Sequence, residues 1–229
     1  MTITSGSNSK GKITLLQKFQ SYTSDVQLEV ILGPPEPKLE LILRNGKLML
    51  ASPTAIYSYE DRYTSFLGAL KKANIKSTPP NSVLILGFGL GSIPLILERK
   101  FGLKPSITAI EIDPRIISLA KYWLPVNTLH SIDLIQADAI FWLSSNTAQF
   151  DLICIDLFID QLVPQACNSP SFLNSVKAAL TPAGQVIFSR LQSDPKEIRE
   201  EFTYAFFSIF PKHSIFNIGG NDIFVGYGL

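Results

Sequence analysis

The sequence predicts an α/β protein in which a mostly parallel, doubly wound sheet follows a small antiparallel β unit. From residue 82 onward, short apolar runs alternate with segments of helical periodicity, a pattern typical of buried parallel strands joined by helices. Residues 26–50 instead alternate single apolar and polar side chains, which is typical of half-buried antiparallel strands. We therefore predict an N-terminal β-hairpin domain over residues 1–57 and a larger domain over residues 58–229.

Composition excludes several classes of protein. Of 229 residues, 46% are hydrophobic, and 20 basic side chains face 19 acidic ones, so the chain can bury a core and carries no electrostatic footprint for nucleic acid or acidic membranes. Two cysteines are too few for a disulfide framework or a four-ligand zinc site. The polar start has no apolar core typical of a secretory signal, and the longest apolar run is shorter than the roughly 20 residues that span a bilayer. We expect a cytoplasmic protein without a nucleic-acid, membrane or metal partner.

The N-terminal unit is expected to turn twice and to lead into a helix. Residues 33–35 read Gly-Pro-Pro, and Asn45-Gly46 between apolar runs is a strong short-hairpin signal. Residues 58–61 resemble a capping box, with Asp61 three positions after Ser58, and predict a helix beginning there. The polar segment 76–80 is expected to link this helix to the parallel sheet.

The larger domain is expected to contain strands and helices in alternation. The predicted strands are 83–86, 107–110, 132–135, 152–155 and 185–188, and the predicted helices are 92–100, 114–123, 139–144, 170–180 and 196–210. The alternation ends at the C-terminus, where two apolar runs flank Gly219-Gly220-Asn221 and predict an antiparallel hairpin.

A glycine-rich turn between the first of these strands and its helix predicts a nucleotide site. Gly87, Phe88, Gly89 and Gly91 form a Gly-x-Gly-x-Gly pattern, in which glycines let a ligand approach the backbone closely. A dinucleotide fingerprint would place its third small residue at Ser92, whereas the spacing found is typical of S-adenosylmethionine sites. The pattern alone is weak, and a nicotinamide-dependent enzyme stays an alternative.

Two acidic residues follow on the next two strands. Glu111, followed by Ile112, ends the second strand, where a carboxylate accepts hydrogen bonds from ribose hydroxyls. Asp138, followed by Ala139, ends the third strand, where an adenine amino group would lie. Glu111 could instead be a solvated residue at the strand end, and Asp138 could instead serve only as the cap of the next helix. Asp113 before a proline is expected to be a helix cap.

The fourth strand also ends in an acid. Asp156 is expected to face the same cleft as the glycine turn, and Asp160 follows in the loop. Each could contact the reacting group, and each could instead be a polar residue of the loop. Tyr59 could belong to the site or to the core at the domain junction.

Taken together, these motifs resemble the spermidine synthase family, the aminopropyltransferases built on the class I methyltransferase fold. The resemblance covers about residues 26–190 and is carried by residues 45–46, 57–61, 87–91, 109–113, 137–139 and 151–156. It implies a Rossmann-like class I methyltransferase fold, a homodimer, and binding of ribose and adenine by Glu111 and Asp138. It further implies that Asp156 accepts a proton from the attacking amine or orients it, and that Tyr59 helps to hold that amine.

The chain departs from this family where the amine would bind. The family's glycine turn carries an aspartate where this chain has Leu90, and that acid helps to hold the aminopropyl ammonium. The acidic motif at 156–160 is one residue longer here and lacks the family's proline. Met49 and Ser65 stand where a glutamine and a histidine are expected.

These departures favour an acceptor with less positive charge than a polyamine, because a polyamine needs several carboxylates. We expect Leu90, Leu157 and Phe158 to make the acceptor space apolar. The hypothesis is a methyltransferase that uses S-adenosylmethionine, without a metal, on a small-molecule acceptor. An aminopropyltransferase that uses decarboxylated S-adenosylmethionine and a non-catalytic nucleoside-binding relative are the alternatives. The expected catalytic residues are Asp156, Tyr59 and Asp160, and the expected co-substrate contacts are Gly87, Phe88, Gly89, Gly91, Glu111, Ile112, Asp138 and Ala139.

Overall fold

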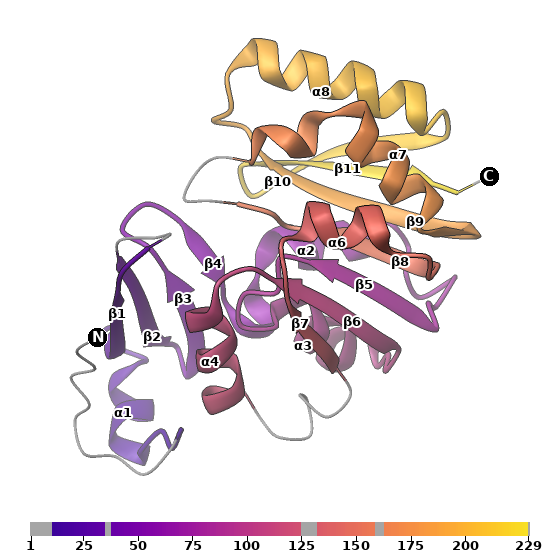
Figure 1. The fold of residues 1–229 in the computed structure, drawn as a ribbon. Helices are drawn as coiled ribbons and strands as arrows, with labels where there is room; N and C mark the ends of the chain where they lie inside the picture. The colour runs from indigo at the N-terminus through magenta and orange to yellow at the C-terminus, as the bar shows by residue number, and fades with distance from the viewer. Residues whose placement is uncertain (1–10, 35–37, 125–131, 159–162, 229) are drawn as a thin grey trace.

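The computed structural model describes residues 11–34, 38–124, 132–158 and 163–228, which fold into two sheets (Figure 1). The first is four-stranded and antiparallel, in the order β1-β2-β3-β4, and the second is seven-stranded, in the order β10-β11-β9-β8-β5-β6-β7. Strands β7, β6, β5, β8 and β9 run parallel, while β11 and β10 run antiparallel. The predicted fold class is confirmed.

The N-terminal sheet follows the predicted alternation of apolar and polar side chains. Its elements are α1 (Leu15–Gln20), β1 (Val26–Leu32), β2 (Lys38–Arg44), β3 (Lys47–Ala51) and β4 (Ile56–Ser58). Leu39, Leu41 and Leu43 of β2 are fully buried. The Asn45-Gly46 turn connects β2 to β3, and both residues have a positive φ, of 50° and 71°, as a tight two-residue hairpin turn requires.

The predicted capping box is wrong. Ser58 ends β4, and its hydroxyl lies 2.7 Å from that of Ser92 instead of capping a helix. A 3₁₀ turn, η1 (Glu60–Arg62), follows, and α2 (Thr64–Lys72) begins only after Tyr63. The prediction assumed that the Ser58 hydroxyl bonds a nearby backbone N–H, but it bonds Ser92, which is distant in the sequence.

Asp61, the expected acid of that box, joins the two sheets instead. It is 4% exposed, and its carboxylate lies 2.8 Å from Lys47 Nζ and 2.9 Å from Lys100 Nζ. Burial opposes the charged form, but the two ammonium groups outweigh it and lower the pKa of Asp61 to about 2. Trp123 Nε1 makes a second link, between α4 and the N-terminal sheet, by donating to Glu29 Oε1 at 2.6 Å.

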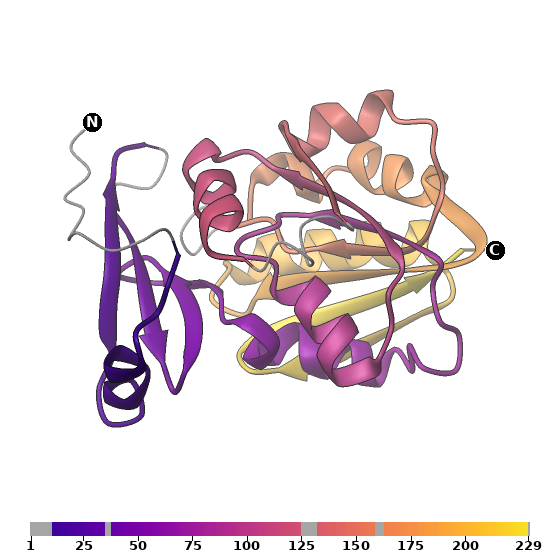
Figure 2. The same ribbon diagram turned by 90° about the horizontal axis from the view of Figure 1, so that it is seen from below.

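Helices cover both faces of the seven-stranded sheet (Figures 1 and 2). The strands are β5 (Ser82–Leu86), β6 (Ser106–Glu111), β7 (Ile132–Gln136), β8 (Phe150–Ile155), β9 (Leu180–Leu191), β10 (His213–Ile218) and β11 (Asn221–Tyr227). Helices α2, α3 (Ser92–Ile96) with its π-helical continuation η2 (Leu97–Phe101), and α4 (Pro114–Trp123) pack into one core cluster. Helices α6 (Ala139–Ser145), α7 (Pro170–Ala178) and α8 (Lys196–Ile209) pack into the other.

This topology decides where a ligand can bind. The chain runs from β5 to β6 and β7 on one side and then returns to β8 on the other side of β5. Ligands of such sheets bind beyond the carboxyl ends of the strands at this reversal. None of the helices in the described ranges has the length and apolar character needed to cross a bilayer.

Candidate active site

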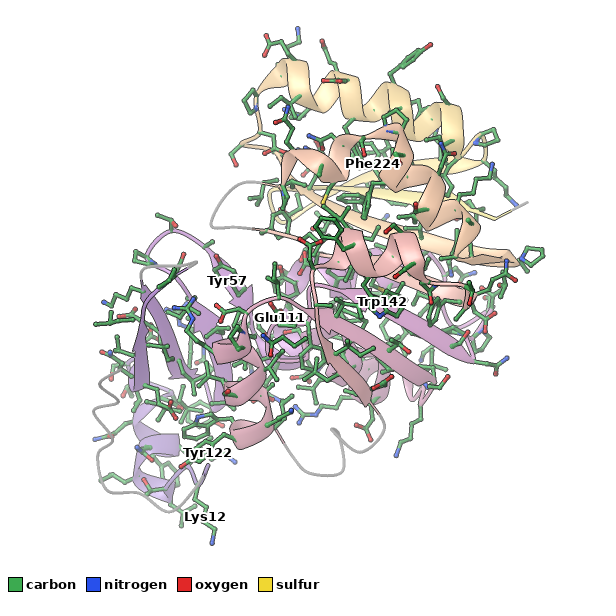
Figure 3. The ribbon with its side chains drawn as sticks, viewed as in Figure 1. Lys12, Tyr57, Glu111, Tyr122, Trp142 and Phe224 are labelled. Carbon is green, nitrogen blue, oxygen red and sulfur yellow. The ribbon has the colours of Figure 1, made fainter. Side chains whose placement is uncertain are left out.

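A cavity of about 710 Å³ lies at this reversal point. Its walls come from the glycine turn after β5, the carboxyl ends of β6 and β8, the segments before α6 and α2, and the tip of the β10–β11 hairpin. Figure 3 labels two of the lining residues, Tyr57 of β4 and Glu111 at the end of β6. One cavity therefore collects segments that are far apart in the sequence.

The glycine turn is built so that backbone, not side chains, forms the cavity wall. Gly87 has a φ of +88°, and a Cβ there would lie 2.3 Å from the carbonyl oxygen of Asp156, so only glycine fits. Gly87 and Gly89 line the cavity, whereas Phe88 is 4% exposed and packs in the core. Gly91, with a φ of +69°, is the N-cap of α3 and is not among the lining residues.

Glu111 lines the cavity and also shapes the turn. Its Oε2 accepts hydrogen bonds from the backbone of Phe88 at 3.2 Å and Gly89 at 3.1 Å, and its Oε1 accepts one from Asp113 N at 3.0 Å. Burial raises the pKa of Glu111, while these N–H groups oppose the increase. A carboxylate has about four acceptor sites, so acceptor capacity remains for ribose hydroxyls. Ile112, next in the chain, is 55% exposed and lines the cavity as well.

The two aspartates after β6 and β7 both cap helices. Asp113 accepts from Arg115 N at 2.8 Å and forms an ion pair with the same arginine, as the structural interpretation predicts. Asp138 Oδ1 accepts from Ile140 N at 2.8 Å and from Phe141 N at 3.2 Å. Asp138 nevertheless lines the cavity, together with Ala139, and its Oδ2 takes no part in the cap. The cap and the ligand interpretations of Asp138 are therefore compatible.

Asp156 follows β8 and lines the cavity beside the glycine turn. Its Oδ1 is buried and has no hydrogen-bond partner among the described residues. Burial raises the pKa of Asp156 to about 7, although the hydroxyls of Tyr63 and Ser189 favour the charged form. A carboxylate that titrates near neutral pH is suited to accept a proton from a reacting group. Asp160 lies outside the described residues.

Tyr63 is a site residue that the sequence analysis missed. It lines the cavity. Burial is the main cause that raises the pKa of its hydroxyl, and the negative charge of the neighbouring Asp156 adds to the increase. Tyr59, the predicted aromatic, lines the cavity too, but its hydroxyl donates to the carbonyl oxygen of Arg44 at 3.2 Å. Tyr59 thus ties the wall to the N-terminal sheet. Had the start of α2 been predicted at Thr64, Tyr63 instead of Tyr59 would have been expected beside Asp156.

Leu90 does not line the cavity, so that expectation is wrong. It is 2% exposed and belongs to the core cluster that also contains residues of α2 and α3. Leu157 and Phe158 do line the cavity, as expected. The side chain of Leu90 enters the core between the sheet and its helices. The sequence alone does not show in which direction this side chain points.

Three further lining residues were not among the predicted site residues. Arg62 is an exposed cation on the wall, Ser65 lies in the first turn of α2, and Asn221 begins β11. Within the described ranges, no group of three or more histidine, cysteine or acidic side chains could hold a metal ion.

Comparisons with known proteins find both methyltransferases and aminopropyltransferases. The family model of the spermine/spermidine synthase domain matches residues 60–205. Human eEF1A lysine and N-terminal methyltransferase is 29% identical over 140 residues, which cover 56% of this chain and 20% of that protein. Polyamine aminopropyltransferase 1 of Streptomyces coelicolor is 29% identical over 160 residues, which cover 66% of this chain and 28% of that protein.

A solved structure shares the fold of the larger part of the chain. Human methyltransferase-like protein 13, determined in complex with SAH, is 25% identical with a TM-score of 0.60, and the match covers 71% of this chain and 78% of that one. The chain spans only 20% and 28% of the lengths of the two curated relatives named above. The family model, in contrast, covers more than half of this chain. The chain therefore belongs to the spermine/spermidine synthase domain family.

Proposed function

We propose that this protein is a methyltransferase that uses S-adenosylmethionine on a small-molecule acceptor. One observation carries the proposal. A buried carboxylate, Asp156, with a pKa of about 7 and an unpartnered oxygen, lies on the same cavity wall as the glycine turn and Glu111. A proton acceptor and a nucleoside site thus share one cavity.

The residues present fit an S-adenosyl nucleotide. Gly87 and Gly89 offer backbone without side chains, and Glu111 and Asp138 keep carboxylate capacity on the lining. When bound, S-adenosylmethionine supplies an electrophilic methyl carbon, whose bond to sulfur breaks with its electron pair as the acceptor's lone pair forms the new bond. Asp156 takes the proton that the acceptor loses, and the Tyr63 hydroxyl steadies the Asp156 carboxylate before the transfer. The protein's contribution is alignment and a base.

The charges on the lining favour methyl transfer over aminopropyl transfer. The acidic residues on the described lining are Glu111, Asp113, Asp138 and Asp156. The first three lie at or just after the ends of β6 and β7, on the proposed nucleoside side, which leaves Asp156 alone beyond the glycine turn. Arg62 adds a positive charge to the wall. Intact S-adenosylmethionine has a carboxylate that complements a cation, whereas its decarboxylated form and polyamines do not.

Calorimetric titration with both nucleotides tests this proposal. We expect S-adenosylmethionine to bind at least about tenfold more tightly than its decarboxylated form, a difference of about 1.4 kcal/mol. Arg62→Gln should reduce that preference without changing the affinity for the decarboxylated form. The opposite preference would support an aminopropyltransferase, which the Streptomyces relative also favours. Binding without turnover of any acceptor would support a nucleoside-binding relative, and failure of both nucleotides to bind would refute the nucleotide site.

The cytoplasmic location and the homodimer remain part of this proposal, because only the family resemblance and the sequence support them. Light scattering after size-exclusion chromatography tests the homodimer. A monomer at micromolar concentration would refute it.

A further inference from the structure

Helix α1 exposes all of its apolar side chains. Leu15, Leu16 and Phe19 are 76%, 67% and 73% exposed, and no residue of the helix is buried. At about 100° of rotation per residue, these three side chains lie on one face of the helix. Tyr22, which follows the helix, is 58% exposed as well. Large apolar side chains that gather on one exposed face mark a surface that binds a membrane or a protein.

The helix is held in place although none of its residues is buried. The Thr14 side chain accepts from Gln17 N at 3.1 Å and the Gln17 side chain accepts from Thr14 N at 2.9 Å, which forms a capping box. At the other end, the carbonyl oxygen of Ser21 accepts from Asn45 N at 2.7 Å, and its hydroxyl accepts from Gly46 N at 2.9 Å. These bonds fix α1 to the turn between β2 and β3, at the edge of the molecule (Figures 1 and 2), so the apolar face stays exposed.

The surroundings of this face are positively charged. Residues 1–24 contain three lysines and no acidic residue, and the side chains of Lys12 and Lys18 are exposed. The next acid along the chain, Asp25, is bound by Arg44. Figure 3 shows Lys12 at the same end of the molecule as α1. The expectation without a membrane partner rested on the charge of the whole chain, which hides this local excess.

Positive charge beside an apolar face selects the partner. A second copy of this chain would pair the same face with itself across a two-fold axis, which would bring the lysines of both copies together and repel them. An anionic lipid surface instead attracts the lysines and takes up the apolar side chains below its headgroups. Tyr22 adds an aromatic ring with a polar end, a side chain typical of the membrane–water interface.

We propose that α1 attaches this protein to the surface of membranes that contain anionic phospholipids. Leu15, Leu16 and Phe19 enter the boundary between headgroups and acyl chains, and Lys12 and Lys18 contact lipid phosphates. A face of this size binds weakly and reversibly, and the helix lies in the plane of the surface instead of spanning it. None of these five residues lines the cavity, so the attachment does not depend on the methyltransferase proposal.

Flotation of the full chain with lipid vesicles tests the proposal. One kind of vesicle contains phosphatidylcholine alone, and the other contains equal parts of phosphatidylcholine and phosphatidylglycerol. We expect the protein to float with the anionic vesicles only. Raising the salt concentration to about 0.5 M should weaken this binding, because salt screens the lysines. Equal binding to the two kinds of vesicle would overturn the proposal.

Variants assign the binding to α1. Phe19→Ser should weaken the partition into anionic vesicles at least about tenfold, because a large apolar side chain is lost from the boundary. Lys12→Gln and Lys18→Gln should each weaken it about fivefold. Phe141→Ser is the matched control, because Phe141 lies on α6 and is 76% exposed, close to the 73% of Phe19. It should leave the binding unchanged.

The outcomes distinguish the lipid surface from other partners of α1. Thermal unfolding of Phe19→Ser should match the wild type, because Phe19 is exposed, so lost binding would not result from a lost fold. If Phe19→Ser binds anionic vesicles as tightly as the wild type, the apolar face does not enter the bilayer and the proposal is refuted. If the wild type floats with neither kind of vesicle, the proposal is also refuted, and a dimer that Phe19→Ser dissociates would identify a second copy as the partner.

Discussion

Asparagine at position 156 should make the fold more stable and the enzyme nearly inactive. The pKa of Asp156 is about 7, against 3.8 for an ordinary aspartate. Between these two pH values the native chain holds a proton that the unfolded chain has released, so the free energy of unfolding falls as pH rises. A difference of about three pKa units corresponds to a loss of about 4 kcal/mol, which is complete above pH 7.

Asp156→Asn removes this loss because an amide has nearly the same shape and carries no charge. The variant should match the wild type near pH 4, where the native carboxyl is protonated, and exceed its free energy of unfolding by up to about 4 kcal/mol at pH 8. Turnover should fall by about 10²-fold or more because the base is gone. This combination distinguishes a base held at an energetic cost from a structural acid, whose removal destabilises the fold.

Urea unfolding of both proteins from pH 4 to pH 8 measures the effect, with Asp133→Asn as the control. Asp133 is exposed on β7, so its replacement should change stability little at any pH. A difference between Asp156→Asn and wild type that stays constant over this range would show that Asp156 does not titrate near pH 7, and the reasoning would be refuted.

Three further predictions concern the pH profile, the nucleotide and the domain junction. Tyr63→Phe removes a hydroxyl that favours the charged form of Asp156, so the rise in turnover through about pH 7 should move to higher pH; an unmoved pH–rate profile would contradict this. Glu111→Gln should weaken S-adenosylmethionine about tenfold or more in calorimetry, since a charged acceptor for ribose hydroxyls is lost; equal affinity would exclude that contact. Asp61→Asn should cost about 2 kcal/mol of unfolding free energy at pH 7, and the cost should vanish as pH falls from 4 to 2, because the pKa of Asp61 is lowered to about 2. Urea denaturation of the variant and the wild type at pH 7 and at pH 2 measures this cost, and an equal cost at the two pH values would contradict the ion-pair explanation.

The nucleoside half of the cavity could be predicted because its signals are local. Gly87 and Gly89 follow β5, Glu111 ends β6, and Asp138 lies two residues after the end of β7. Parallel strands bring their carboxyl ends to one edge, so the order of motifs in the sequence already implies their proximity. The helix caps at Asp113 and Asp138 are local for the same reason.

The part of the cavity beyond the glycine turn could be predicted only at Asp156, Leu157 and Phe158, because long-range contacts build the rest. Ser65 and Asn221 are separated by most of the chain and meet only when the C-terminal hairpin packs against α2. Tyr63 was missed because the hydroxyl of Ser58 bonds Ser92 instead of a local backbone group, which moves the helix start to Thr64. Leu90 was misplaced because its direction depends on how the turn joins α3 to the sheet.

The close contact at Gly87 has a consequence for how such a protein can diversify. A side chain on Gly87 would collide with the backbone oxygen of Asp156, and Asp156 N bonds Leu86 O at 2.9 Å. Under the proposed function, the distance from the bound nucleotide to Asp156 is therefore set by neighbouring main chains, which leave little room for adjustment. Residues on α2 and β11 line other parts of the same cavity. Descendants of this protein can exchange those residues and adopt new acceptors while the geometry of transfer is inherited unchanged.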